Sequence, residues 1–236
     1  MRKVIIIFVC LTFGVATCSY AGENRFQQFS LDVEKAYSAY RKALFQTNKK
    51  NAEESGKANS MFLKQWDKLL QTYDLQPPEI FSSDPQWNET LMNIKEIAVK
   101  SGIQIDEGTL EEAHETLEAV REELSKLRQR NSVIVFSDHI NNYHEVMEGL
   151  LTKKFTPDDI DDVRGQLAVL QYLAGVIKEN APQKYLENKK YQQLQRGLFA
   201  SLEALRQAIE GKDSETIARS IKMLKPAYAQ LFVNFG

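Results

Sequence analysis

The sequence predicts an all-α protein of about eight antiparallel helices. Apolar residues recur at steps of three and four along most of the chain, which is the spacing of one helix face. No segment alternates apolar and polar residues as a half-buried strand does, and the connections between periodic segments are short and polar. The composition is ordinary for a globular protein, and a formal charge of -2 gives no reason to expect nucleic acid or an anionic membrane as a partner.

The N-terminal segment has the features of a signal peptide. Arg2 and Lys3 precede an apolar run from Val4 to Val15, which is too short to be a stable membrane anchor. Ser19 and Ala21 place small residues where signal peptidase requires them, so we expect residues 1–21 to be removed and the protein to be periplasmic or secreted. The alternative is a lipoprotein attached through Cys18, for which the preceding Thr17 is a poor residue.

Cleavage after Ala21 removes both cysteines, Cys10 and Cys18. The mature chain then has no thiol. A cysteine-based zinc site, a thiol nucleophile and haem attached through thioethers are therefore excluded, and stability has to come from packing.

The first half of the mature chain contains four periodic segments. The first runs from about Phe26 to Gln46, and its apolar face consists of Phe26, Phe29, Val33, Tyr37, Tyr40 and Leu44. A polar turn at 48–51 follows, and the second segment ends near Tyr73, before Pro77 and Pro78. The third follows the cap-like sequence 83–85 and stops near Gly102, which a loop at 103–108 follows. The fourth extends to about Arg130.

The second half begins with a helix near Ser137 and Asp138. The sequence Thr156-Pro157-Asp158-Asp159 is expected to open the next helix, with a capping residue, a first-turn proline and acids that suit the helix dipole. Ala181-Pro182 ends that helix, and a closing helical hairpin spans about 185–235, with its turn at 210–213.

The last helix has the most continuous apolar seam. It consists of Ile217, Ile221, Leu224, Tyr228, Leu231 and Phe235. Pro226 lies inside this seam and removes one helical hydrogen bond, at a cost of about 3 kcal/mol. Burial of the seam outweighs that cost, so we expect the helix to continue past Pro226 with a bend. The bend is either structural or opens a ligand cavity between helices.

The chain is expected to form two four-helix units, residues 22–131 and 132–236, and the alternative is a single eight-helix body. An internal repeat favours two units, because two apolar stripes align. They are Phe62, Trp66, Leu69 and Tyr73 in the first half, and Leu224, Tyr228, Leu231 and Phe235 in the second. The alternative explanation is that any two heptad-like helices align in this way.

The stretches Arg196-Gly197-Leu198, Ala208-Ile209-Glu210-Gly211-Lys212 and Leu224-Lys225 resemble the closing hairpin of the periplasmic four-helix-bundle cytochromes, of the c-prime type and their soluble b-type relatives. The resemblance implies a helical bundle and a periplasmic location. In that family the last helix carries haem through Cys-x-x-Cys-His or a lone histidine. Here Tyr228 and Leu231 occupy the cysteine positions and Phe232 the histidine position, so we expect no haem on the closing helix.

The candidate metal ligands are three histidines and one methionine. These are His114, His139, His144 and Met147. Glu111, His114 and Glu118 share one helix face, but the second Glu-x-x-His copy that a di-iron site needs is missing. His144 and Met147 could bind copper, although a methionine on a core stripe more often packs.

No catalytic signature is present. The sequence has no glycine-rich phosphate loop, and nothing in the pattern predicts the exposed nucleophile and oxyanion pocket of a Ser-His-Asp site. We therefore expect a non-enzymatic exported protein with a binding or scaffolding role for an unknown protein or small molecule. We assign no catalytic, cofactor-binding or metal-binding residues. The alternative is a protein that binds a metal or non-covalent haem through the histidines and Met147.

Overall fold

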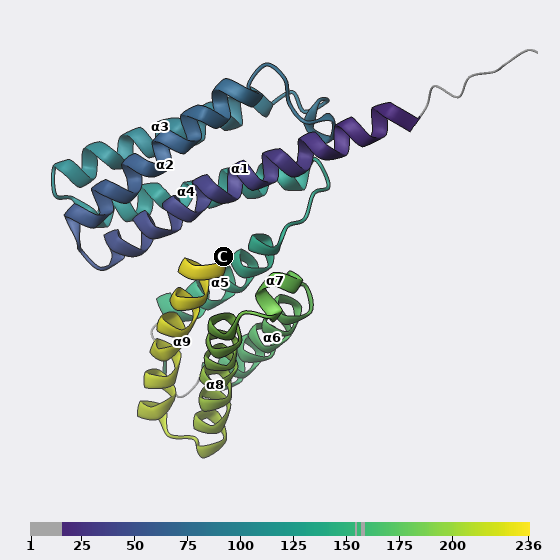
Figure 1. Cartoon of the computed structure of the whole chain (residues 1–236). Coiled ribbons are helices and arrows are strands. Elements are labelled where there is room, and N and C mark those ends of the chain that lie inside the picture. Colours follow the sequence, from purple (N-terminus) through teal and green to yellow (C-terminus); the bar gives the residue numbers. More distant parts are fainter. Residues whose placement is uncertain (1–15, 154, 157–158) are drawn as a thin grey trace, which may run out of the picture.

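The structure is a computed structural model that describes residues 16–153, 155–156 and 159–236, with side chains from residue 24 onward. It is all-α, as predicted, and the described residues contain no strand (Figure 1). The helices are α1 (Ala16–Asn48), α2 (Ala52–Tyr73), α3 (Trp87–Asp106), α4 (Leu110–Arg130), α5 (Phe136–Thr152), α6 (Ile160–Glu179), α7 (Gln183–Leu186), α8 (Lys189–Gly211) and α9 (Ser214–Phe235), with a short 3-10 helix, η1 (Glu79–Phe81).

Helices α1 to α4 lie side by side, and α5 to α9 form a second group below them in Figure 1. Within the first group each helix packs on the next and α4 returns to α1; in the second, α5 packs on α6 and α9, and α8 on α6 and α9. Helix α1 also packs against α9, and most buried apolar side chains of both groups form one continuous core. Ile105, Leu110 and Ala113 form a small separate cluster in the first group. The division at 131–132 into separate units stays a prediction.

The apolar seam predicted for the last helix is confirmed. Ile217, Ile221, Leu224, Tyr228, Leu231 and Phe235 are all buried on α9. The helix is unbroken at Pro226, as expected when the burial of six large side chains outweighs one lost hydrogen bond. Its N-terminus is capped by Asp213, whose carboxylate accepts hydrogen bonds from the backbone N–H groups of Glu215 and Thr216.

The predicted stop of the third helix at Gly102 is wrong, because α3 continues to Asp106. Gly102 lies where α2 approaches closely: a Cβ there would be 3.0 Å from Nδ2 of Asn59. Asn59 is buried, and its Nδ2 donates to the carbonyl of Ala98 at 2.8 Å. The glycine thus allows two helices to pack tightly, and the predicted loop at 103–108 is mostly helix.

Two other helix starts differ from the prediction. The closing hairpin does not begin at Tyr185 as one helix, because Asn188 caps a new helix and separates α7 from α8. Thr156 does not cap α6; it donates from its N–H and hydroxyl to the Asp159 carboxylate, at 2.7 and 2.6 Å. Pro157 and Asp158 lie outside the described residues.

Most of the predicted signal peptide also lies outside the described residues, and no side chain before residue 24 is described. Helix α1 begins at Ala16 instead of near Phe26, and it includes the predicted cleavage site after Ala21. Export, cleavage and the alternative lipid attachment at Cys18 therefore stay predictions. None of the helices in the described part is long and apolar enough to cross a membrane.

Candidate functional site

A cavity of about 570 Å³ lies where α1 and α4 face α5 and α7. Helix α1 contributes one face to it, at the helical spacing of Phe26, Phe29, Val33 and Tyr37. The other wall residues that matter for its chemistry are Phe81, Leu124, Leu127, Arg128, Val133, Phe136, Lys184, Tyr185 and Phe235. A cavity of this volume is in the range of small-molecule binding sites.

The cavity wall is mostly apolar and strongly aromatic. The rings of Phe26 and Phe81 lie 6.0 Å apart at one side, and Tyr185 packs edge-on against Phe136 and Phe235 at 5.4 and 5.1 Å. These rings come from five elements, α1, η1, α5, α7 and α9. The cavity is therefore formed only when the two groups of helices pack together.

Two of the charged side chains at the cavity have partners. Glu34 pairs with Arg41 at 3.1 Å, and the Arg128 guanidinium holds both oxygens of Asp138 at 2.5 to 2.9 Å. Lys184 is exposed at the mouth, with its ammonium 5.1 Å from the Tyr185 ring centre. No carboxylate of the described residues lies within 4.0 Å of Lys184, so its positive charge is uncompensated.

A layer of buried polar groups continues from the cavity along α1 and α5. Among the described residues, these atoms have no well-aligned hydrogen-bond partner: the hydroxyls of Tyr37, Tyr40 and Tyr143, both side-chain amide atoms of Asn141, and Nε and Nη1 of Arg41. Asn141 lies close to the Tyr37 hydroxyl, but the pair lacks good hydrogen-bond geometry. Such groups are rare in folded proteins, because each carries a desolvation cost of about 1–3 kcal/mol.

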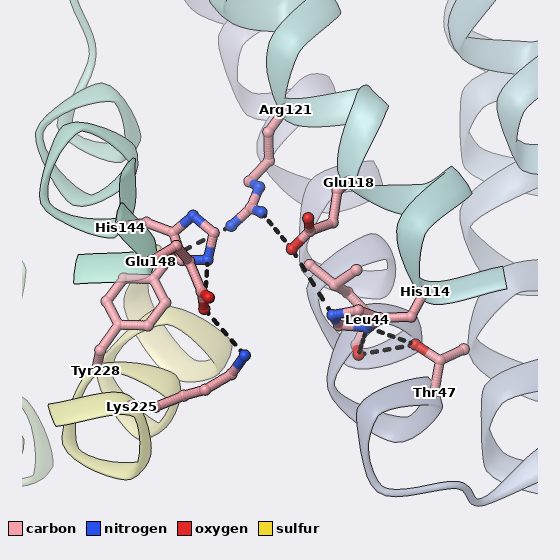
Figure 2. Close-up of polar contacts among 9 residues, drawn as sticks. All are labelled: Leu44, Thr47, His114, Glu118, Arg121, His144, Glu148, Lys225 and Tyr228. Carbon is pink, nitrogen blue, oxygen red and sulfur yellow. Dashed lines mark hydrogen bonds and ion pairs between the residues drawn. The ribbon is translucent and has the colours of Figure 1, made fainter. Parts of the chain in front are cut away.

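Beyond this layer lies a polar cluster, in which His114 connects α4 to α1 (Figure 2). Its Nδ1 lies 3.1 Å from both the Leu44 carbonyl and the Thr47 hydroxyl, so Nδ1 carries the proton that the carbonyl accepts. Nε2 faces Glu118 at 3.7 Å, and Glu118 accepts a hydrogen bond from Arg121 at 2.8 Å. Burial lowers the pKa of His114, which favours the neutral ring.

The other half of the polar cluster joins α5 to α9, as Figure 2 shows. Oε1 of Glu148 lies 2.9 Å from the Lys225 ammonium and 3.4 Å from Nε2 of His144, in the geometry of ion pairs. Arg121 reaches across from α4 and donates to the Tyr228 hydroxyl at 3.4 Å. The His144 contact and Lys225 hold the pKa of Glu148 at about 2, against the effect of burial.

The structure brings together some of the predicted ligands and separates the others. His114 and His144 both line the polar cluster, whereas His139 takes no part in it and Met147 is fully buried in the core. Glu111 is exposed, away from the His114 contacts. Across the described ranges, no group of three or more His, Cys, Asp and Glu side chains is arranged for a metal ion.

The chemistry of the cluster also disfavours a cation. Its space is about 40 Å³, and its two carboxylates, Glu118 and Glu148, are already engaged by Arg121 and Lys225. A metal ion would have to displace these fixed positive charges. The polar cluster thus acts as a contact between helices.

The cavity was not predicted from the sequence. The α1 stripe was identified, but Phe81 and Tyr185 lie in short segments next to prolines that sequence periodicity does not assign to a face. The only sequence feature that could have indicated the cavity was an aromatic residue in an otherwise polar connection.

The positions that align with the haem ligands of the cytochromes are Tyr228, Leu231 and Phe232, and all three are buried. The rings of Tyr228 and Phe232 stack, with their centres 5.7 Å apart.

Comparison with family models, with curated proteins and with solved structures gave no match. Function therefore has to be inferred from the geometry of the described residues.

Proposed function

We propose that this protein is a non-enzymatic, exported binding protein that holds an apolar small molecule in the cavity between α1, α4, α5 and α7. The observation that supports the proposal is the cavity itself, with about 570 Å³ of space and a mostly apolar, aromatic wall. Aromatic side chains provide large and rigid contact surfaces for an apolar ligand. The export part of the proposal depends on residues 1–21 alone.

The expected affinity follows from the cavity size. A ligand of about twenty heavy atoms would gain about 0.3 kcal/mol per atom, which corresponds to a Kd of tens of micromolar. Ligand binding would also stabilise the packing of the two helix groups, because both contribute to the wall.

The test is a titration with the neutral fluorescent probe N-phenylnaphthylamine, using the wild type and two tryptophan variants. Ser30 is half-buried at the cavity wall, so Ser30→Trp fills part of the space. Ser60→Trp places the same side chain at an exposed position of α2, away from the cavity. We expect saturable binding by the wild type and Ser60→Trp, and affinity at least about tenfold lower in Ser30→Trp.

Circular dichroism and thermal unfolding establish that both variants are folded. If the wild type shows no saturable binding, or if folded Ser30→Trp binds as well as Ser60→Trp, the cavity is not the binding site and the proposal is wrong.

A further inference from the structure

We propose that the ligand of the cavity is an amphiphile with an anionic oxygen headgroup, such as a carboxylate, bound next to Tyr37 and Arg41. This inference rests on the proposed function and adds the ligand class and its orientation. The apolar chain would lie among the rings of the cavity. The headgroup would lie at the inner end, where the apolar wall meets the layer of unpartnered polar groups.

The first support is that Arg41 is buried with part of its guanidinium unpartnered. Its side chain is only 3% exposed, and one terminal nitrogen pairs with Glu34 at 3.1 Å. Nε and Nη1 are buried and have no hydrogen-bond partner among the described residues. A buried guanidinium with two unpartnered donor nitrogens is energetically costly, and an oxyanion is the partner that satisfies donors in this arrangement best.

Tyr37 links Arg41 to the cavity. The Arg41 guanidinium carbon lies 5.5 Å from the Tyr37 ring centre, and both Tyr37 and Glu34 line the cavity. The Tyr37 hydroxyl is buried and has no well-aligned partner. Burial raises its pKa, so this hydroxyl stays protonated and can donate to a ligand oxygen.

The hydrogen-bond donors and the charges around the cavity indicate the chemical class of the headgroup. Of the residues with unpartnered buried atoms, Tyr37 lines the cavity and Arg41 packs over the Tyr37 ring. The unpartnered groups of both residues can donate, and the Asn141 amide is an additional donor and acceptor. An amine headgroup would add further donors and a positive charge beside a guanidinium. Among the side-chain charges at the cavity, Glu34 and Arg128 are each paired, whereas Lys184 at the mouth has no ion-pair partner within the part of the chain that the structure describes.

The experiment compares dodecanoate with dodecanol, which have the same chain but differ in headgroup charge. Each is used to displace N-phenylnaphthylamine at pH 8, where the carboxylic acid is ionised. Dodecanoate is kept below its micelle concentration and dodecanol below its solubility limit. We expect dodecanoate to bind at least about tenfold more tightly than dodecanol to the wild type. Tyr37→Phe should reduce this preference about fivefold or more.

Tyr143→Phe is the matched control. It also removes a buried hydroxyl without a partner, but Tyr143 does not line the cavity, so the preference for dodecanoate should be unchanged. Arg41→Lys keeps the charge but loses the planar fork, and should also reduce the preference. Tyr37→Phe is expected to fold whether or not Arg41→Lys does, because the Tyr37 hydroxyl makes no well-aligned hydrogen bond to any residue that the structure describes.

The outcomes separate this inference from the proposed function. If dodecanoate and dodecanol bind equally, the headgroup inference is overturned while the apolar site stands. If Lys184→Met abolishes the preference and Tyr37→Phe does not, the headgroup lies at the mouth and the proposed orientation is overturned. If N-phenylnaphthylamine does not bind at all, the proposed function itself fails.

Discussion

Replacing Glu148 with glutamine removes the carboxylate that joins His144 on α5 to Lys225 on α9. The variant keeps the size and shape of the side chain but loses its charge. It also leaves the Lys225 ammonium without its only ionic contact among the described residues. We expect Glu148→Gln to lower the free energy of unfolding at neutral pH.

The magnitude follows from the pKa of Glu148, which the His144 contact and Lys225 lower from an ordinary 4.5 to about 2. At about 1.36 kcal/mol for each pH unit, this difference corresponds to an upper limit of about 3.4 kcal/mol. Because the Glu148 side chain is 28% exposed, water screens part of the interaction, and we expect about 1–2 kcal/mol.

The pH dependence has a defined sign. The folded-state pKa lies below the unfolded value, so the stabilisation is fully present above pH 4.5 and is lost as the pH falls from 4.5 towards about 2. Urea unfolding of the wild type and Glu148→Gln at several pH values measures the difference. Glu145→Gln is the control, since Glu145 is exposed on the same helix and has no ion pair among the described residues. A difference below about 0.3 kcal/mol, or one that does not shrink between pH 5 and pH 3, would refute the reasoning.

Three further substitutions test packing and backbone geometry. Leu224→Ala should destabilise the protein by about 2–5 kcal/mol in urea unfolding, because Leu224 is fully buried in the α9 seam; a loss under about 0.5 kcal/mol would contradict its placement. Tyr143→Phe should leave the free energy of unfolding unchanged or raise it by about 1 kcal/mol, since the Tyr143 hydroxyl is buried and has no hydrogen-bond partner among the described residues; a loss above about 1 kcal/mol would show that the hydroxyl is bound. Lys212→Gly should raise the melting temperature, because Lys212 has φ of 53° at the end of α8, and a lower melting temperature would oppose this explanation.

Much of the helical architecture follows from local rules. The α9 seam was identified from apolar spacing alone, and the structure buries all of it. Asn51 and Asp213 mark helix starts because their side chains accept hydrogen bonds from the first turn. Gly102 misled the prediction because a glycine that permits close helix packing has the same sequence appearance as one that ends a helix.

The candidate site could be predicted only in part, because it depends on how α1 and α4 meet α5, α7 and α9. The face of α1 that includes Tyr37 was identified as apolar, but no local pattern indicates that it borders a cavity. The pairing of Glu34 with Arg41, and the two unpartnered nitrogens of Arg41, depend on side-chain geometry and burial. His114 and His144 were identified as two of four candidate metal ligands, but the guanidinium of Arg121 lies within the same cluster as both.

The most direct test of the central claim is a crystal structure of the protein with bromonaphthalene, in which the anomalous signal of bromine locates the ligand. The proposal predicts a bromine peak inside the cavity, between Phe26 and Val33 of α1 and Tyr185 of α7, and a loss of that peak in Ser30→Trp. A peak only at surface sites, with the cavity unoccupied by bromine at saturating ligand, would contradict the proposal that this protein binds apolar small molecules between its two groups of helices.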